Sequence, residues 1–174
     1  MSELDEAWAL ALAEAERRAR LSGRTDLAEY LALRNSNDLL RKTAVEWLLD
    51  TFRELAGQSN RSGSSIQIAA DDQHRFRLGQ ATMVGRLLTL RNGVRTLFVE
   101  AGWPRTPRDG FVRGGGLACA NIRHLGLASK SQELLLLKSQ TGAPNWVVVN
   151  SPMGRLVLLA ENISRHLEVL VDRN

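Results

Sequence analysis

The first 57 residues carry apolar side chains at the three- and four-residue spacing of amphipathic helices. One helix is predicted over residues 3–21, and Ser22-Gly23 suits its end because glycine accepts the left-handed backbone found there. A second helix begins near Asp26. Its pattern is interrupted at Asn35-Ser36-Asn37, whose side chains compete for backbone hydrogen bonds, and then resumes as far as Gly57. We therefore predict two or three helices in antiparallel contact.

After a polar linker at residues 58–65, the hydrophobic period becomes two, which is the period of a β-strand. Strands are predicted over residues 66–70 and 75–78, with Asp71-Asp72 as the turn between them. Two further strands are predicted over residues 133–138 and 146–150. Residues 117–125 fit either a short helix or a strand.

The clearest local pattern runs from Leu87 to Val99, where Asn92-Gly93 separates two β-rich segments. Asn-Gly is typical of a two-residue hairpin turn with positive φ at both central positions. The resulting register pairs Leu88 with Leu97 and places Leu90 and Val99 on the same face. Because both faces are largely apolar, we expect this hairpin in the middle of the sheet.

Helical spacing returns from Leu156 to Leu170. The order of elements predicts an α+β fold in which two or three N-terminal helices pack beside a mostly antiparallel sheet of five to seven strands. A C-terminal helix closes this fold, and an open sheet and a small curled barrel both satisfy the pattern. We expect one domain over residues 1–174, with a helical part (1–57), the linker (58–65) and a β part with its C-terminal helix (66–174).

Charge is distributed unevenly along the chain. Residues 1–57 carry 8 basic and 11 acidic side chains, whereas residues 58–128 carry 10 basic and 4 acidic ones. The sequence pI of about 10.0 reflects a basic set of 20 arginines and three lysines beside a single tyrosine, so few groups titrate between neutral pH and pH 12. The pI is therefore a weak indicator of nucleic-acid binding, and the basic middle segment is the more informative feature.

The remaining composition is that of an ordinary globular protein with 44% hydrophobic and 24% charged residues. The single cysteine, Cys119, excludes an intrachain disulfide. The acidic first residues do not resemble a secretion signal, and no apolar run approaches the length of a membrane span. We expect a cytoplasmic protein that does not contact membranes.

Residues 103–116 form a Pro/Gly-rich loop that combines arginines, aromatic rings and glycines. Arginine binds phosphate with two parallel hydrogen bonds, and aromatic rings stack on bases. The loop therefore suits an acidic, phosphorylated or nucleic-acid partner. An ordinary surface connection with solvating arginines is the plainer interpretation. The candidate binding residues here are Trp103, Arg105, Arg108, Phe111 and Arg113.

A second candidate is an arginine-bearing sheet face, because Arg75 and Arg77 lie on one side of a predicted strand. Arg86 and Arg95 share a side of the hairpin, and if the two sides coincide, the four side chains would follow a phosphate backbone. Leucines on the same hairpin face favour a buried surface that excludes charge.

Residues suited to catalysis are few. The pair Cys119 and His124 is a conceivable nucleophile and base, and Asp71-Asp72 with His74 a conceivable cation site, but a buried thiol and turn chemistry explain these groups better. We therefore assign no catalytic residue, metal or cofactor.

The sequence favours a non-catalytic binding or adaptor protein whose residues 103–116 contact an acidic or phosphorylated partner. Apolar surface on the helical part predicts self-association as a homodimer. The alternatives are a nucleic-acid-binding protein that uses the loop and the Arg75/Arg77 face, and a small hydrolase of unknown substrate.

Overall fold

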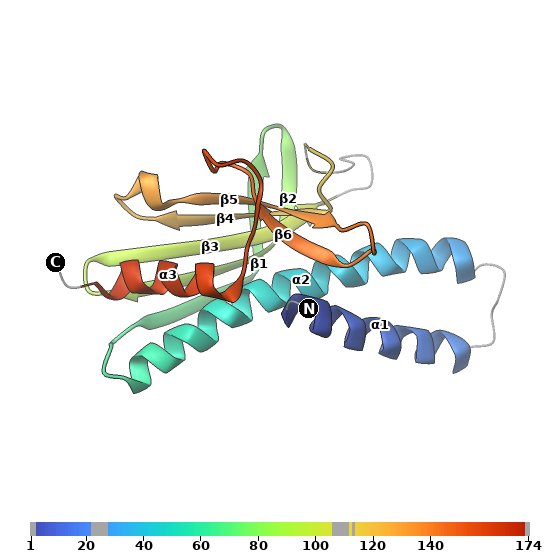
Figure 1. Ribbon diagram of the computed structural model, residues 1–174, viewed down its shortest axis with the longest axis horizontal. Helices are drawn as coiled ribbons and strands as arrows, with labels where there is room; N and C mark the ends of the chain where they lie inside the picture. The colour runs from blue at the N-terminus through green and yellow to red at the C-terminus, as the bar shows by residue number, and fades with distance from the viewer. Residues whose placement is uncertain (1–2, 22–27, 106–111, 113, 173–174) are drawn as a thin grey trace.

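The computed structural model of the chain describes residues 3–21, 28–105, 112 and 114–172, and has the predicted α+β fold. Helices α1 (Glu3–Leu21) and α2 (Ala28–Arg61) precede a seven-stranded antiparallel sheet, and α3 (Ala160–Val171) follows it. Helix α2 crosses one face of the sheet, α1 lies beside its N-terminal half and α3 beside its C-terminal half (Figure 1). Over the described residues, no helix has an apolar stretch long enough to cross a membrane.

Helix α2 is continuous through Asn35-Ser36-Asn37, so the predicted break there is wrong. Side chains such as these weaken a helix by competing for backbone hydrogen bonds. Here the Asn37 side chain is engaged elsewhere, because its Oδ1 atom accepts a hydrogen bond from Nζ of Lys138 at 2.6 Å. The helix also continues past the predicted end at Gly57 and reaches Arg61.

The predicted polar linker, residues 58–65, is partly helical, since α2 ends within it. Its remaining part is held by Asn60. The Asn60 Nδ2 donates to the carbonyl of Ile66 at 2.9 Å, and its Oδ1 accepts from the Ile66 N–H at 2.7 Å. This pair of hydrogen bonds ties the end of the helix to the start of the first strand.

The sheet is an open meander in which each strand pairs with the next one in the chain. The sequence of residues 117–125 fits a helix or a strand, and the structure places strand β4 there. Every second residue of this strand, Ala118, Ala120 and Ile122, points into the main core. The strands are β1 (Gln67–Leu78), β2 (Ala81–Asn92), β3 (Arg95–Pro104), β4 (Ala118–His124), β5 (Gln132–Lys138), β6 (Pro144–Val148) and β7 (Leu156–Val157). The short 3-10 helix η2 (Ala128–Lys130) links β4 to β5.

Strand β1 contains the Asp71-Asp72 pair that predicted a turn, so that prediction is wrong. The pair lies at a bulge, because the register with β2 shifts between Asp71 and His74. The Asp71 Oδ1 accepts from the N–H of Gln73 at 2.9 Å, and the Asp72 Oδ1 accepts from Nε of Arg86 in β2 at 2.7 Å. The two aspartates therefore stabilise a bulge within β1, and the strand continues beyond it.

The β2–β3 hairpin has the predicted faces but a different turn. Its loop is Gly93-Val94, and Gly93 alone of the two has positive φ, +61°, which is typical of a turn with glycine first. The predicted pairing is therefore wrong by two residues, since Asn92 faces Arg95 and Leu90 faces Leu97. A shift of two preserves the faces.

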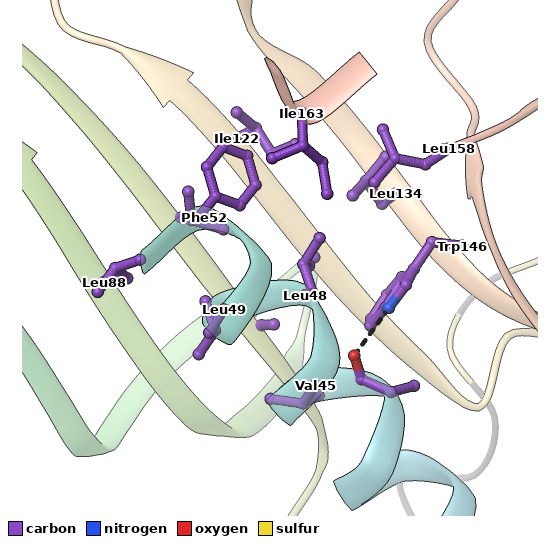
Figure 2. Close-up of a cluster of buried hydrophobic side chains, with 14 of the residues drawn as sticks. Val45, Leu48, Leu49, Phe52, Leu88, Ile122, Leu134, Trp146, Leu158 and Ile163 are labelled. Carbon is purple, nitrogen blue, oxygen red and sulfur yellow. Dashed lines mark hydrogen bonds between the residues drawn. The ribbon is translucent and has the colours of Figure 1, made fainter. Parts of the chain in front are cut away.

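The main hydrophobic core lies between α2, α3 and the sheet (Figure 2). Leu48 and Phe52 of α2 are fully buried against the sheet, and Ile163 joins them from α3. The indole of Trp146 in β6 donates to the backbone carbonyl of Ala44 at 3.0 Å. This bond satisfies the indole N–H, the one polar group of the Trp146 side chain, and sets the position of α2 over β6.

Helix α3 begins four residues later than predicted, because Leu156 belongs to β7. At its start, the N–H of Leu159 donates to Oδ1 of Asn162 at 2.8 Å. At its end, Nδ2 of Asn92 donates to the carbonyl of Leu170 at 3.1 Å, and a guanidinium N–H of Arg95 donates to the carbonyl of Val169. The last carbonyls of a helix lack partners within it, so these side chains fasten α3 to the hairpin.

The distal half of the β1–β2 hairpin curls over the face of the sheet that lacks helices. Its side chains Phe76 and Met83 pack in a second cluster with Cys119 of β4 and Leu135 of β5. In a flat sheet, β1 and β5 would be roughly 19 Å apart, so this contact requires a strong curl.

Two glycines lie where the curl begins, opposite each other on β2 and β3. A Cβ atom on Gly85 would lie 1.9 Å from the carbonyl oxygen of Ala101, and one on Gly102 would lie 2.4 Å from that of Val84. The two backbones approach so closely that no side chain fits between them.

Replacing Gly85 with alanine should therefore destabilise the fold by at least about 2 kcal/mol, because the strands must separate to accept the methyl group. Gly57→Ala is the matched control. Gly57 lies within α2, where an added Cβ meets nothing nearer than 3.6 Å, and alanine should stabilise that helix by about 0.5–1 kcal/mol. Urea unfolding of both variants measures the difference, and equal effects would contradict the close approach.

Candidate functional site

Two arginines that are distant in the sequence lie in one cross-strand row. Arg77 of β1 faces Thr82 of β2, and the N–H of Arg105 donates to the carbonyl of Thr82 at 3.0 Å just beyond the end of β3. Directly opposed residues of an antiparallel sheet project to the same side. Arg77 and Arg105 therefore share one face, separated by one strand.

The adjacent row contains Arg75, Val84 and Trp103. Its position two residues along each strand places it on the same side as the first row. Trp103 is partly buried and packs against the main core, whereas Arg75, Arg77 and Arg105 are exposed. We call Arg75, Arg77, Arg105 and Trp103 the arginine face.

The three guanidinium groups of the arginine face form no ion pair with any described residue. The Nη2 of Arg77 donates only to the carbonyl of Gln80, at 3.1 Å. Six other arginines of the described chain are paired with nearby carboxylates; these are Arg18, Arg41, Arg53, Arg86, Arg123 and Arg165. The arginine face therefore retains uncompensated positive charge.

The predicted continuation of this face along the hairpin is not available for binding. Register places Arg86 on the same side as Val84, but its guanidinium is paired with Asp72. Arg95 donates to the end of α3. These two arginines have structural partners, which separates them from Arg75 and Arg77.

Three of the predicted loop residues, Arg108, Phe111 and Arg113, lie outside the described residues. Val112, between two of them, is buried in the second cluster, and its N–H donates to the carbonyl of Gly116 at 2.9 Å. Among the described residues of this segment, Trp103 and Arg105 thus belong to the arginine face, and Val112 belongs to the second cluster.

A buried polar network, not predicted from the sequence, lies on the same open face of the sheet as the second cluster. Glu100 is only 7% exposed, yet it accepts from His74 at 2.8 Å and from Asn121 at 3.0 Å. Arg123 forms an ion pair with Glu100 at 3.5 Å, and its guanidinium lies over the ring of Phe98. Gly85, which lies opposite His74 on β2, has no side chain to block the His74 ring on its way to Glu100. The network ties the curled hairpin to β3 and β4.

The conceivable catalytic pairs are not assembled. Cys119 and His124 are five residues apart on β4 and therefore point to opposite faces, and burial raises the pKa of the Cys119 thiol to about 12. Asp71, Asp72 and His74 each have a different partner. Within the described ranges, no three His, Cys, Asp or Glu side chains gather in a way that would hold a metal ion.

His124 and His166 form a buried pair between β4 and α3. The Nδ1 of His166 lies 2.8 Å from Nε2 of His124, and the Nε2 of His166 lies 2.9 Å from Oε1 of Gln132, which can only accept. His166 therefore donates to Gln132 and accepts from His124, so the His166 ring is neutral. Burial lowers the pKa of His166 to about 4, with a further contribution from His124. Burial, followed by Lys130 and Arg95, lowers the pKa of His124.

Stability should fall as the pH drops from about 6.5 toward 4. An unfolded histidine binds a proton below about pH 6.5, whereas folded His166 resists protonation until about pH 4. Between these values the unfolded state binds more protons, so acidification favours it, by roughly 3 kcal/mol in total for His166. Urea unfolding from pH 7.5 to 4.5 measures this slope.

His166→Leu should flatten that slope, while His74→Gln should leave it unchanged because His74 lies outside the pair. Where His166→Leu fails to fold, proton NMR of the unmodified protein serves instead. Ring signals of His166 that titrate near pH 6.5 would contradict the buried pair.

The self-association predicted from the helical part stays a prediction. Leu4 and Trp8 of α1 are buried in the main core, while Leu10 and Leu21 are 75% and 77% exposed. Scattered exposed leucines are common on monomeric proteins, so these two side chains do not decide the oligomeric state.

Comparisons with known proteins place the chain in no family. No family model, curated protein or solved structure matches it. Function is therefore inferred from the contacts and charges of the described residues.

Proposed function

We propose that this chain is a non-catalytic binding protein whose arginine face holds an extended acidic or phosphorylated segment of a partner protein. The observation that carries this proposal is the pair of cross-strand rows, which gathers Arg75, Arg77 and Arg105 on one side without carboxylate partners among the described residues. Exposed, uncompensated guanidinium groups favour ligands with carboxylate or phosphate oxygens.

The spacing of these arginines suits an extended ligand. Alternate residues of a strand are about 7 Å apart, so Arg75 and Arg77 match two acidic side chains at alternate positions of an extended segment. Arg105 lies roughly 10 Å from Arg77, across one strand, and would add positive potential beside the segment. Trp103 adds partly buried aromatic surface beside the charges.

The position of β1 favours binding by strand addition. Among the strands that the structure describes, β1 is the first of the sheet and pairs with β2 alone, so its outer edge has backbone donors and acceptors without partners in those strands. An added strand would place alternate side chains on the same face as Arg75 and Arg77. The backbone would supply affinity, and the arginines would select acidic residues.

Orientation of the arginine face is set by the opposite side of the same hairpin. Phe76 and Leu78 alternate with the two arginines and pack into the second cluster. Rotation of the strand would expose these apolar side chains, so the arginines are directed away from the cluster. A surface built on paired strands needs little ordering when a ligand binds.

The binding test uses a fluorescent peptide with phosphoserine at two alternate positions among valines. Its anisotropy should show saturable binding to the protein, and the triple variant Arg75→Gln/Arg77→Gln/Arg105→Gln should bind at least about tenfold more weakly, because charge-assisted hydrogen bonds are lost. A peptide with adjacent phosphoserines should bind more weakly than the alternating one.

The matched control is Arg61→Gln/Arg91→Gln/Arg155→Gln, which removes the same charge from other exposed positions. An equal loss in both triple variants would show non-specific attraction and overturn the proposal. A single-stranded oligonucleotide distinguishes the other partner class. If the oligonucleotide binds with a steep salt dependence that requires Arg75, Arg77 and Arg105, and the peptide does not bind, the face is a nucleic-acid site instead.

A further inference from the structure

A pocket that is separate from the arginine face lies between α3 and the β4–β5 connection. It has a volume of about 300 Å³ and is lined by residues from η2, β5, the end of β6, the following turn and α3. This volume is at the low end for small-molecule sites. The pocket therefore suits an ion or a small metabolite rather than a macromolecule.

The charged side chains that line this pocket are all basic. Lys130 and Arg165 are at its wall, and no carboxylate is among the lining residues. Arg165 is paired with Glu161 at 2.8 Å, an exposed pair with both side chains more than 60% accessible, so solvent screens it. Lys130 forms no ion pair with any residue that the structure describes. The pocket is thus electropositive.

Two serine hydroxyl groups of the lining accept hydrogen bonds from the backbone and can still donate their own hydrogens. The Ser131 Oγ accepts from the N–H of His124 at 3.4 Å, and the Ser151 Oγ accepts from the N–H of Met153 at 3.2 Å. A hydroxyl that accepts from the backbone still has its own hydrogen to donate. Both serines therefore offer donors to the pocket.

The amide side chains of the lining are biased in the same direction. The Oδ1 of Asn162 accepts from the N–H of Leu159, and the Oε1 of Gln132 accepts from His166. Each amide then has an NH₂ group with no assigned partner among the described residues. The fold thus occupies the oxygens of these side chains and leaves N–H and O–H groups for a ligand.

We propose that this pocket binds a compact oxyanion, namely a phosphate group that is free or attached to a small molecule. Two cations, two hydroxyl donors and two amide donors from η2, β5, the Ser151 turn and α3 surround it, and no carboxylate lines it. The donor set is the complement of a tetrahedral anion with several acceptor oxygens. This site is independent of the arginine face.

A neighbouring hollow provides a contrast. It shares Ser131, Gln132 and Asn150 with the pocket but is lined by Glu133 as well as Arg123. A carboxylate in the lining repels an anion, so the ion should select the pocket between η2 and α3.

The test is a titration of the ¹⁵N-labelled full chain with sodium phosphate at constant ionic strength, followed by NMR. Saturable shifts should be concentrated at Ser129–Gln132, at Asn150 and Ser151, and at the first turns of α3. The variant Lys130→Gln/Arg165→Gln should weaken phosphate binding by about tenfold or more, because two charge-assisted contacts are lost. Ser151→Ala, which removes one hydroxyl donor, should weaken it several-fold.

The matched control is Lys42→Gln/Arg53→Gln on α2. Like the test pair, it combines an exposed lysine that pairs with no carboxylate in the described part of the chain and an arginine paired with a nearby carboxylate, Asp50. Glycerol phosphate that binds more tightly than inorganic phosphate would identify a phosphorylated small molecule as the ligand, and equal affinities would identify the free ion. Absence of saturable shifts, shifts centred on Phe98 and Arg123, or an equal loss in the control would overturn the proposal.

Discussion

The close approach of β2 and β3 at Gly85 and Gly102 is the constraint on which the candidate binding surface depends. Without side chains at these positions, the backbones come close enough for the distal β1–β2 hairpin to curl over the open face of the sheet. The apolar side of the hairpin is thereby buried, and the side bearing Arg75 and Arg77 is directed away from the cluster. The same space allows His74 to reach the buried Glu100. The curl, the polar network and the arginine face are therefore three consequences of one backbone contact.

The helix side of the sheet is organised by a different principle, in which polar side chains fasten helices to strands around the apolar core. Trp146 bonds the backbone of α2, and Asn92 and Arg95 satisfy the last carbonyls of α3. The Trp146 bond pairs a group that would otherwise be buried without a partner, so its loss would cost more than its formation contributes. Gln132, which bonds His166, and Asn162, which bonds the start of α3, also line the pocket between η2 and α3.

Local pattern predicted much of the fold, since α1, strands β3, β5 and β6, and the core face of the hairpin follow from hydrophobic period alone. It failed where a polar side chain has a distant partner. Asn37 suggested a helix break but bonds Lys138, and Asp72 suggested a turn but pairs with Arg86. The shared side of Arg75 and Arg77 was predictable because it depends on strand alternation. Their position beside Arg105 was not, because it depends on the register of three strands.

The partner of each arginine shows which charges of the basic middle segment stabilise the fold and which remain uncompensated. Arg86 and Arg123 are paired with carboxylates, and Arg95 is bonded to the end of a helix, so these charges stabilise the fold and contribute little field at the surface. Arg75, Arg77 and Arg105 differ in that they share one face of the sheet and also have no counter-charge among the described residues. The same reasoning applies to the donors beside α3. In both places, the groups left unsatisfied by the fold define the chemistry of the ligand that we propose: oxygen-rich and negatively charged.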